Sequence, residues 1–242
     1  MTGMVATAAR VLKQLRHDPR TVGLMLMVPT VVIALLWWIY AGDETFDIAG
    51  LLMLGMFPLI INFIVTAVAT LRERTSGTLE RLSTLPLGKL EFLLGYAIGF
   101  GLLATAQTVL VASITVGLLD LQIVGSPVLL GVVALLNALL GMSMGLFVSA
   151  FAHNEFQAVQ FFPALVIPQL LLCGLLAPRD SMPDPLPAIS NVLPLSYGVD
   201  AIRAIQAGAD TVADVGTELL VVGAFIVGFL LLGAATLRRR TE

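Results

Sequence analysis

Six long apolar runs alternate with short polar segments along the chain. A helix that crosses the hydrocarbon core of a bilayer needs about 20 apolar residues, because each residue adds about 1.5 Å across a core about 30 Å thick. Every run meets this requirement, so the pattern predicts an all-α integral membrane protein. The six transmembrane helices are expected at residues 21–41, 48–71, 91–118, 126–151, 157–177 and 216–237.

Composition supports a membrane location. Hydrophobic residues make up 58% of the 242 residues and charged residues only 12%, with a mean hydropathy of +0.97. Because a soluble domain carries about 25% charged residues, this chain has too little polar surface to cover a globule. The first apolar run is too long for a cleavable signal peptide and follows a fairly polar arm. The single cysteine, Cys173, rules out an intrachain disulfide and reads as an inert buried thiol.

The basic residues predict the orientation. Eleven of the thirteen lysines and arginines lie in the N-terminal arm, in the segment 72–89 or in the C-terminal tail, which six spans place on one side. The other side holds only Arg179 and Arg203 among nine acidic residues. Cytoplasmic loops are enriched in lysine and arginine, so both termini and the segment 72–89 are expected in the cytoplasm. Trp37, Trp38 and Tyr40 end the first span, where an outer aromatic belt is expected.

The predicted spans contain amides but no charge near their centres. An intramembrane charge costs at least ~2.5 kcal/mol and usually marks an ion relay, so its absence weakens a proton- or sodium-driven mechanism. Five amides are candidates for a substrate path; the alternative for each is an ordinary interhelical hydrogen bond. These candidates are Asn62, Gln107, Asn137, Gln160 and Gln169.

Small residues and prolines predict how the spans pack. Two small-residue motifs, Gly95-x-x-x-Gly99 and Gly141-x-x-x-Gly145, allow close helix approach. Pro58 is expected to kink the second span, and Pro163 and Pro168 are expected to bend the fifth. Each bend serves either as a hinge or cavity wall, or as a static kink.

The sequence contains few motifs typical of a nucleotide-binding, metal-binding or catalytic site. The chain has no GxxxxGK[ST] string, and therefore no Walker A loop of its own. His17 and His153 are the only histidines, and neither has a metal-ligand partner at a helical or zinc-finger spacing, so no metal site is predicted. No catalytic residue is assigned.

The polar segment RERTSGTLERLSTLPLGK, residues 72–89, is longer than a tight turn between two spans requires. Its centre places Leu79, Leu82 and Leu85 along one side of a short helix, and Pro86 ends it. Such a helix either lies in the lipid interface, or is a capped loop, or docks into a groove of a partner protein.

Three segments resemble the type-2 ATP-binding-cassette (ABC) exporter permeases, a family that includes drug-resistance and polysaccharide or lipid exporters. RERTSGTLERLSTLPL is similar to the family's coupling helix, which seats in the ATPase subunit. MPDPLPAISNVLPLSYGVDAIRAI, residues 182–205, resembles the segment between the fifth and sixth spans, which forms short re-entrant helices near the outer mouth. ARVLKQLRHDPR, residues 9–20, fits the interfacial helix before the first span.

The resemblance implies a single transmembrane domain over residues 1–242, with an interfacial helix at 1–20, a coupling-helix loop at 72–89 and a re-entrant segment at 178–215. It assigns ATPase coupling to six residues, Gly77, Thr78, Leu79, Glu80, Arg81 and Leu82. It assigns an outer gate to Pro194, Tyr197 and Arg203. For Pro194 and Tyr197 the alternative is a packed loop, and Arg203 has an alternative pairing with Asp200, three residues earlier.

The function implied is an ATP-driven exporter of a hydrophobic or amphipathic substrate, such as a drug, a lipid or a lipid-linked glycan. ATP and magnesium are expected on two separate ATPase subunits, with no cofactor in this chain. A second permease copy, identical rather than different, and membrane lipids are the other expected partners; a nucleic acid is not expected. The alternatives are a membrane-embedded lipid-modifying enzyme and a secondary transporter.

Overall fold

The computed structural model describes residues 3–40, 43–75, 89–175 and 177–236. In the described part every regular element is helical, and six helices are long and apolar enough to cross a membrane. The prediction of an all-α membrane protein with six spans is therefore confirmed. The spanning helices are α2 (Pro19–Tyr40), α3 (Glu44–Thr75), α5 (Lys89–Gly117), α6 (Pro127–Val148), α7 (Glu155–Leu172) and α10 (Gly216–Thr236).

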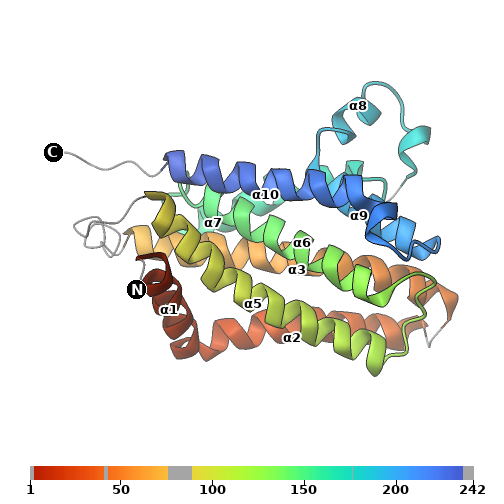
Figure 1. The fold of residues 1–242 in the computed structure, drawn as a ribbon, viewed down its shortest axis with the longest axis horizontal. Coiled ribbons are helices and arrows are strands. Elements are labelled where there is room, and N and C mark those ends of the chain that lie inside the picture. The colour runs from red at the N-terminus through yellow and green to blue at the C-terminus, as the bar shows by residue number, and fades with distance from the viewer. Residues whose placement is uncertain (1–2, 41–42, 76–88, 176, 237–242) are drawn as a thin grey trace.

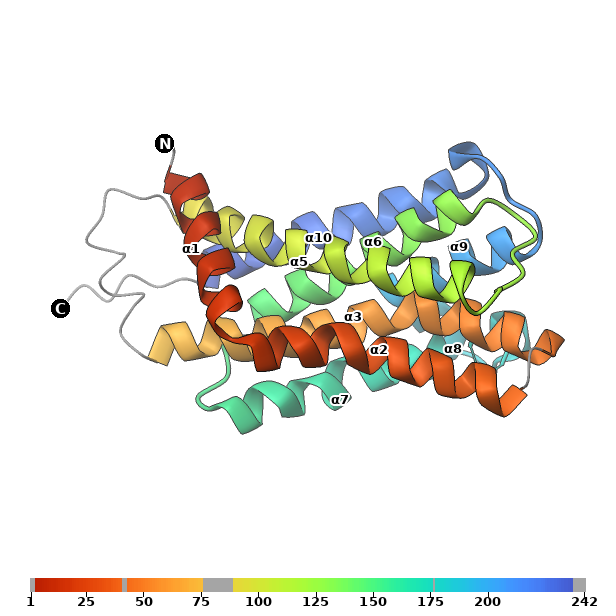
Figure 2. The same ribbon diagram turned by 90° about the horizontal axis from the view of Figure 1, so that it is seen from below.

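The remaining elements lie at the two ends of this bundle. Helix α1 (Gly3–His17) lies across one end, where α3 finishes and α5 begins (Figures 1 and 2). The opposite end carries the short helix α8 (Leu186–Ser190) and helix α9 (Pro194–Gln206). Two 3₁₀ turns, η1 (Arg179–Ser181) and η2 (Val212–Val215), complete that end. Helix α1 and the last turns of α10 thus lie at the same end of the bundle (Figure 1).

Helices α3 and α6 form the centre of the bundle, and glycine allows their close approach. A methyl group on Gly141 would collide with the backbone of Leu59, and one on Gly145 would lie 2.5 Å from the carbonyl oxygen of Phe63. Only a residue without a side chain fits at these positions, so the small-residue motif in the fourth predicted span is a real helix interface.

The other glycine motif faces α1 instead of another span. A methyl group on Gly95 would lie 2.5 Å from Cβ of Thr7, and one on Gly99 would lie 2.8 Å from Cγ1 of Val11. Helix α1 buries Ala8, Val11 and Leu15 against α5, while its basic side chains remain at the surface. The amphipathic arm is therefore packed closely onto the bundle over several turns.

Three helix boundaries differ from the predicted spans by four residues or more: both ends of α3 and the end of α7. Helix α3 extends several residues beyond the apolar run 48–71 at both ends. In its last turns Glu73 pairs with Arg10 of α1, and Arg72 pairs with Glu155 of α7. Helix α7 ends at Leu172, earlier than the predicted 177, because Gly174 adopts a φ of +89°. Glycine is the residue that commonly ends a helix in this left-handed conformation.

Candidate functional site

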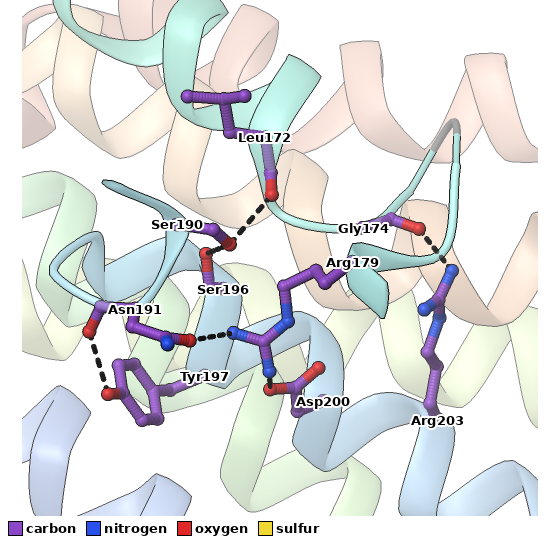
Figure 3. Close-up of polar contacts among 9 residues, drawn as sticks. All are labelled: Leu172, Gly174, Arg179, Ser190, Asn191, Ser196, Tyr197, Asp200 and Arg203. Carbon is purple, nitrogen blue, oxygen red and sulfur yellow. Dashed lines mark hydrogen bonds and ion pairs between the residues drawn. The ribbon is translucent and has the colours of Figure 1, made fainter. Parts of the chain in front are cut away.

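The outer segment predicted to form a gate is held together by polar contacts, and we call its described residues, 173–175 and 177–207, the cap. Arg179 of η1 forms an ion pair with Asp200 of α9 and donates a hydrogen bond to Oδ1 of Asn191, at 3.2 Å (Figure 3). One guanidinium therefore joins η1, the end of α8 and the middle of α9. Sequence analysis did not single out Arg179, because no spacing rule connects it with Asp200.

Arg203 has a different partner from the one that its spacing suggested. Its guanidinium donates a hydrogen bond to the carbonyl oxygen of Gly174, while the Asp200 carboxylate is engaged by Arg179 (Figure 3). The alternative of an Arg203–Asp200 pair is thus wrong in this structure. Arg203 instead fixes the turn in which Gly174 follows α7, and this ties the end of α7 to α9.

Tyr197 and Pro194 occupy the start of α9. The Tyr197 hydroxyl donates to the carbonyl oxygen of Asn191 at 2.8 Å (Figure 3). Pro194 lies in the first turn of α9, where its missing N–H is not needed by the helix. Ser190 bonds to both the Leu172 carbonyl oxygen, at 2.8 Å, and the Ser196 hydroxyl, at 3.0 Å. The structure therefore brings the three predicted gate residues onto one helix that is bonded to the end of α7.

Asp200 is half-buried among these groups. Burial raises the pKa of its carboxyl above the ordinary value of 3.8, and the positive charges of Arg179 and Arg203 oppose part of that rise. The cap thus contains a carboxylate whose charge is stabilised mainly by one neighbouring arginine.

The amides predicted inside the membrane do not form one continuous group. Asn62 of α3 donates to Oε1 of Gln107 of α5 at 2.7 Å, and both side chains are fully buried. Asn137 is equally buried and donates to the carbonyl oxygen of Gly55 at 2.9 Å. Gln169 is also buried and donates to the Leu165 carbonyl oxygen within its own helix, whereas Gln160 is exposed on the outside of the bundle.

Gln107 also compensates for a proline that sequence analysis did not weigh. Pro29 lies inside α2 and has no N–H, so the carbonyl oxygen of Met25, four residues earlier, loses its helical partner. The amide of Gln107 donates to this oxygen at 3.1 Å. A single polar side chain therefore joins α2, α3 and α5, as expected where helix-breaking residues occur in a membrane.

At the end where α1 lies, a partly buried ion pair connects three helices. The Arg10 guanidinium donates to both carboxylate oxygens of Glu73, at 3.0 and 2.8 Å, and also to the hydroxyl of Tyr96. Glu73 lies in the last turns of α3 and Tyr96 early in α5, so Arg10 of α1 joins the two helices that flank residues 76–88. Sequence reasoning missed these residues, which are 63 and 86 positions from Arg10.

A second ion pair lies nearby at the surface. Arg72 of α3 binds Glu155 of α7 through two hydrogen bonds, at 2.7 and 2.9 Å. The six predicted coupling residues, Gly77 to Leu82, lie outside the residues that the structure describes. Helix α3, which precedes them in the chain, is bound to α1 by one ion pair and to α7 by another.

Comparison with known proteins decides the family. The sequence profile of the ABC-2 type transporter family matches residues 3–207, which include all the described helices from α1 to α9. This chain belongs to the ABC-2 type transporter family. This membership and the six candidate membrane spans agree with the resemblance found in the sequence.

Several curated proteins are similar to this family member. The probable multidrug ABC transporter permease YbhS of Escherichia coli K12 is 29% identical over 147 residues, which are 60% of this chain and 39% of YbhS. ABC transporter G family member 20 of Dictyostelium discoideum is 28% identical over 142 residues, 59% of this chain and 20% of that protein. Nodulation protein J of Rhizobium leguminosarum is 34% identical over 98 residues, 40% of this chain and 38% of that protein. The chain thus aligns with at most about two fifths of the length of these relatives.

Proposed function

We propose that this chain is the permease subunit of an ATP-driven exporter that moves a hydrophobic or amphipathic molecule out of the cytoplasm. The observation that carries the proposal is the ABC-2 match over residues 3–207 together with six candidate spans. Drugs, lipids and lipid-linked glycans are the candidate cargoes; a multidrug role is named for YbhS. ATP and magnesium would bind to two partner ATPase subunits, as expected for the ABC-2 type transporter family.

The proposed location is a prokaryotic plasma membrane, with the α1 end of the bundle in the cytoplasm. The basic residues of the N-terminal arm and of the segment 72–89 support this orientation. In this orientation α1 lies along the cytoplasmic face as the interfacial helix, and the cap faces outward as the re-entrant segment.

Coupling to the ATPase would pass through residues 77–82. A push on this segment would be transmitted to Thr75 and Lys89, the ends of α3 and α5 that flank it. Support comes from the Arg10–Glu73 pair, which fixes these two helices to α1, so that the three elements move as one unit.

Two copies of the chain are proposed to form the transport path, and a homodimer is the simplest arrangement. Helices α2, α7 and α10 leave most of their apolar surface outside the described bundle, in contrast to the largely buried α6. A second copy would cover part of this surface, and membrane lipids the rest. Asn62, Gln107, Asn137, Gln160 and Gln169 remain the candidates for contacts with cargo.

The outer gate is proposed to be α9 with Pro194, Tyr197 and Arg203. The bond from Arg203 to the Gly174 carbonyl oxygen supports this role, because movement of α9 relative to the end of α7 must break it. Tyr197 ties the start of α9 to Asn191, at the end of α8. Export would then require these contacts to form and break with each cycle.

The test of the proposed function is the reversal of charge at Glu80. A buried, hydrogen-bonded charge at a protein interface is worth roughly 2–5 kcal/mol when its partner is left unpaired, whereas a surface change usually falls within about 0.5 kcal/mol. Glu80→Lys is expected to reduce ATPase co-purification and transport together, at normal expression and thermal stability. Glu242→Lys, which makes the same charge change in the tail, is the control. Unchanged docking and transport in Glu80→Lys would refute the assignment.

A further inference from the structure

Helix α9, which carries the proposed outer gate, closes over two buried apolar clusters of the bundle. Ile202 belongs to one of them, together with Leu54 of α3 and Val133 of α6. Val199 belongs to the other, together with Cys173, which follows α7 and is fully buried. Movement of the middle of α9 away from α3 and α6 would therefore uncover Cys173.

In its middle, α9 rests on the side chain of Asn137, a residue of α6. Gly198 is the residue of α9 at this point, and a methyl group on it would collide with Oδ1 of Asn137 and lie 2.9 Å from Nδ2. One turn later, Ile202 occupies the space that a methyl group on Gly55 of α3 would need. Residues four apart lie on the same face of a helix, so α9 meets both helices through one face. We call Gly55, Asn137, Gly198 and Ile202 the seat of α9.

The amide of Asn137 is hydrogen-bonded to α3 but not to α9. Its Nδ2 donates to the Gly55 carbonyl oxygen at 2.9 Å, and this bond turns Oδ1 toward Gly198. Asn137 is fully buried, and its Oδ1 has no hydrogen-bond partner among the residues that the structure describes. The contact between Asn137 and α9 is therefore steric. It can open without breaking a hydrogen bond, and an acceptor that is costly to bury unpaired would then be free to bind water.

The end of α9 is bound to the start of α6 by the backbone. The N–H of Gly125 donates to the Ile205 carbonyl oxygen at 3.0 Å, and the N–H of Ser126 donates to the Ala209 carbonyl oxygen at 3.2 Å. Glycine allows this approach, because a methyl group on Gly125 would lie 2.6 Å from the Ile205 carbonyl oxygen. Two hydrogen bonds thus anchor the end of α9, whereas its middle meets α6 through the steric contact of the seat.

We propose that Asn137 and Gly198 set the closed position of the outer gate, and that α9 opens by turning about its anchored end, so that the seat separates and water reaches Cys173. This mechanism rests on the outer gate proposed above and adds the residues that position it. The amide of Asn137 fixes how closely α9 approaches α6, and only glycine at position 198 permits that approach. Glycine inside a helix costs stability relative to alanine, and the seat is the structural reason for glycine here.

The test measures how fast a water-soluble maleimide reacts with Cys173, the only cysteine of the chain, in the full chain purified in detergent. Gly198→Ala should raise the rate ~10-fold or more, because the added methyl group displaces α9 from the amide of Asn137. Gly223→Ala is the matched control, since a methyl group on this glycine of α10 meets no atom within 4 Å, and it should leave the rate unchanged.

A double variant tests whether Asn137 is the cause of the displacement. Asn137→Ala removes the three atoms that lie closest to a methyl group on Gly198. The rate in Gly198→Ala/Asn137→Ala should therefore return to that of Asn137→Ala alone. If Gly198→Ala lacks a cooperative thermal transition, Asn137→Gln takes its place, because it lengthens the amide toward α9 and should also raise the rate.

A second reporter follows the anchored end of α9. Ile205 is fully buried, and Ile205→Cys in a Cys173→Ser background should stay protected when Gly198→Ala is added. Labelling at position 205 would show that α9 does not turn about this end.

Two further outcomes would overturn the proposal. Equal rates in Gly198→Ala and Gly223→Ala would show that the Asn137 side chain yields and α9 stays in place. A double variant as reactive as Gly198→Ala would show that the displacement does not depend on Asn137. The labelling needs neither ATPase nor cargo, so its failure is distinct from a failure of the exporter assignment, which the Glu80 variant tests.

Discussion

The guanidinium of Arg10 binds both carboxylate oxygens of Glu73, a side chain that is only 6% exposed. Arg10 itself remains 31% exposed, so water screens one side of the pair. The two residues belong to the first helix and to the last turns of the third. Their contact fixes the amphipathic arm to the helix that leads into the proposed coupling segment.

This pair is expected to contribute measurably to stability. Breaking a buried pair by removing one partner costs about 3–5 kcal/mol, and the partial exposure of Arg10 reduces that figure to roughly 1–3 kcal/mol. Glu73→Gln should therefore lower the thermal unfolding temperature of the purified chain. The matched control is Glu155→Gln, because the Arg72–Glu155 pair is 54% and 52% exposed and such pairs contribute about 1 kcal/mol or less. Equal effects of the two substitutions would contradict the prediction.

Replacing two glycines of α6 by alanine is expected to change the stability of the protein in opposite directions, because only one of them faces α3. Gly145→Ala places a methyl group 2.5 Å from the Phe63 carbonyl oxygen, and overpacking of this kind costs about 1–3 kcal/mol. Gly131→Ala meets no atom within 4 Å and should stabilise the helix by about 0.5–1 kcal/mol. Thermal unfolding of both variants in the same detergent checks the signs. Stabilisation by Gly145→Ala would show that α3 and α6 are not in close contact.

The stability of the protein is expected to depend on pH through the carboxyl group of Asp200 in the cap. Burial raises the pKa of Asp200 in the native protein above its ordinary value of 3.8. At a pH between 3.8 and the native pKa, the native protein therefore binds more protons than the unfolded chain. Its contribution to stability is therefore greatest below pH 3.8 and falls as the pH rises through the native pKa. Arg179→Met removes a positive charge that stabilises the Asp200 carboxylate, so the native pKa of Asp200 should rise further. The decrease in stability with rising pH should then continue to a higher pH.

Thermal unfolding between about pH 4 and 8 measures this difference. The control is the double variant Arg179→Met/Asp200→Asn, in which no carboxyl remains at this position, and the extended fall should disappear. If the unfolding temperature of Arg179→Met stops decreasing at the same pH as that of the wild type, Arg179 does not act on the Asp200 carboxylate.

The proposed orientation predicts which end of the bundle is outside. A cysteine that replaces Ser181, an exposed residue of η1, should react with an impermeant thiol reagent added to intact cells, whereas one that replaces Ser76 should not. The wild-type chain is the control, because its only cysteine, Cys173, is fully buried and should stay unlabelled. Labelling at position 76 with protection at 181 would invert the orientation.

The sequence by itself determined the number of spans and their positions. Hydrophobic length is a property of consecutive residues, and no tertiary contact is needed to read it. The two small-residue motifs were visible in the same way, because their spacing lies within one turn of a helix. Family membership followed from the stretches 72–87 and 182–205, whose residue order is distinctive.

The partners of the polar side chains were decided only by the tertiary structure. Arg203 was three residues from a carboxylate but bonds to the Gly174 carbonyl oxygen, 29 positions away. Likewise the Met25 carbonyl oxygen takes its hydrogen bond from Gln107, across 82 positions. Buried polar groups must find partners wherever the packed helices bring them together. The packing of the helices decides which polar groups come within hydrogen-bonding distance, and the order of residues along the chain does not show this.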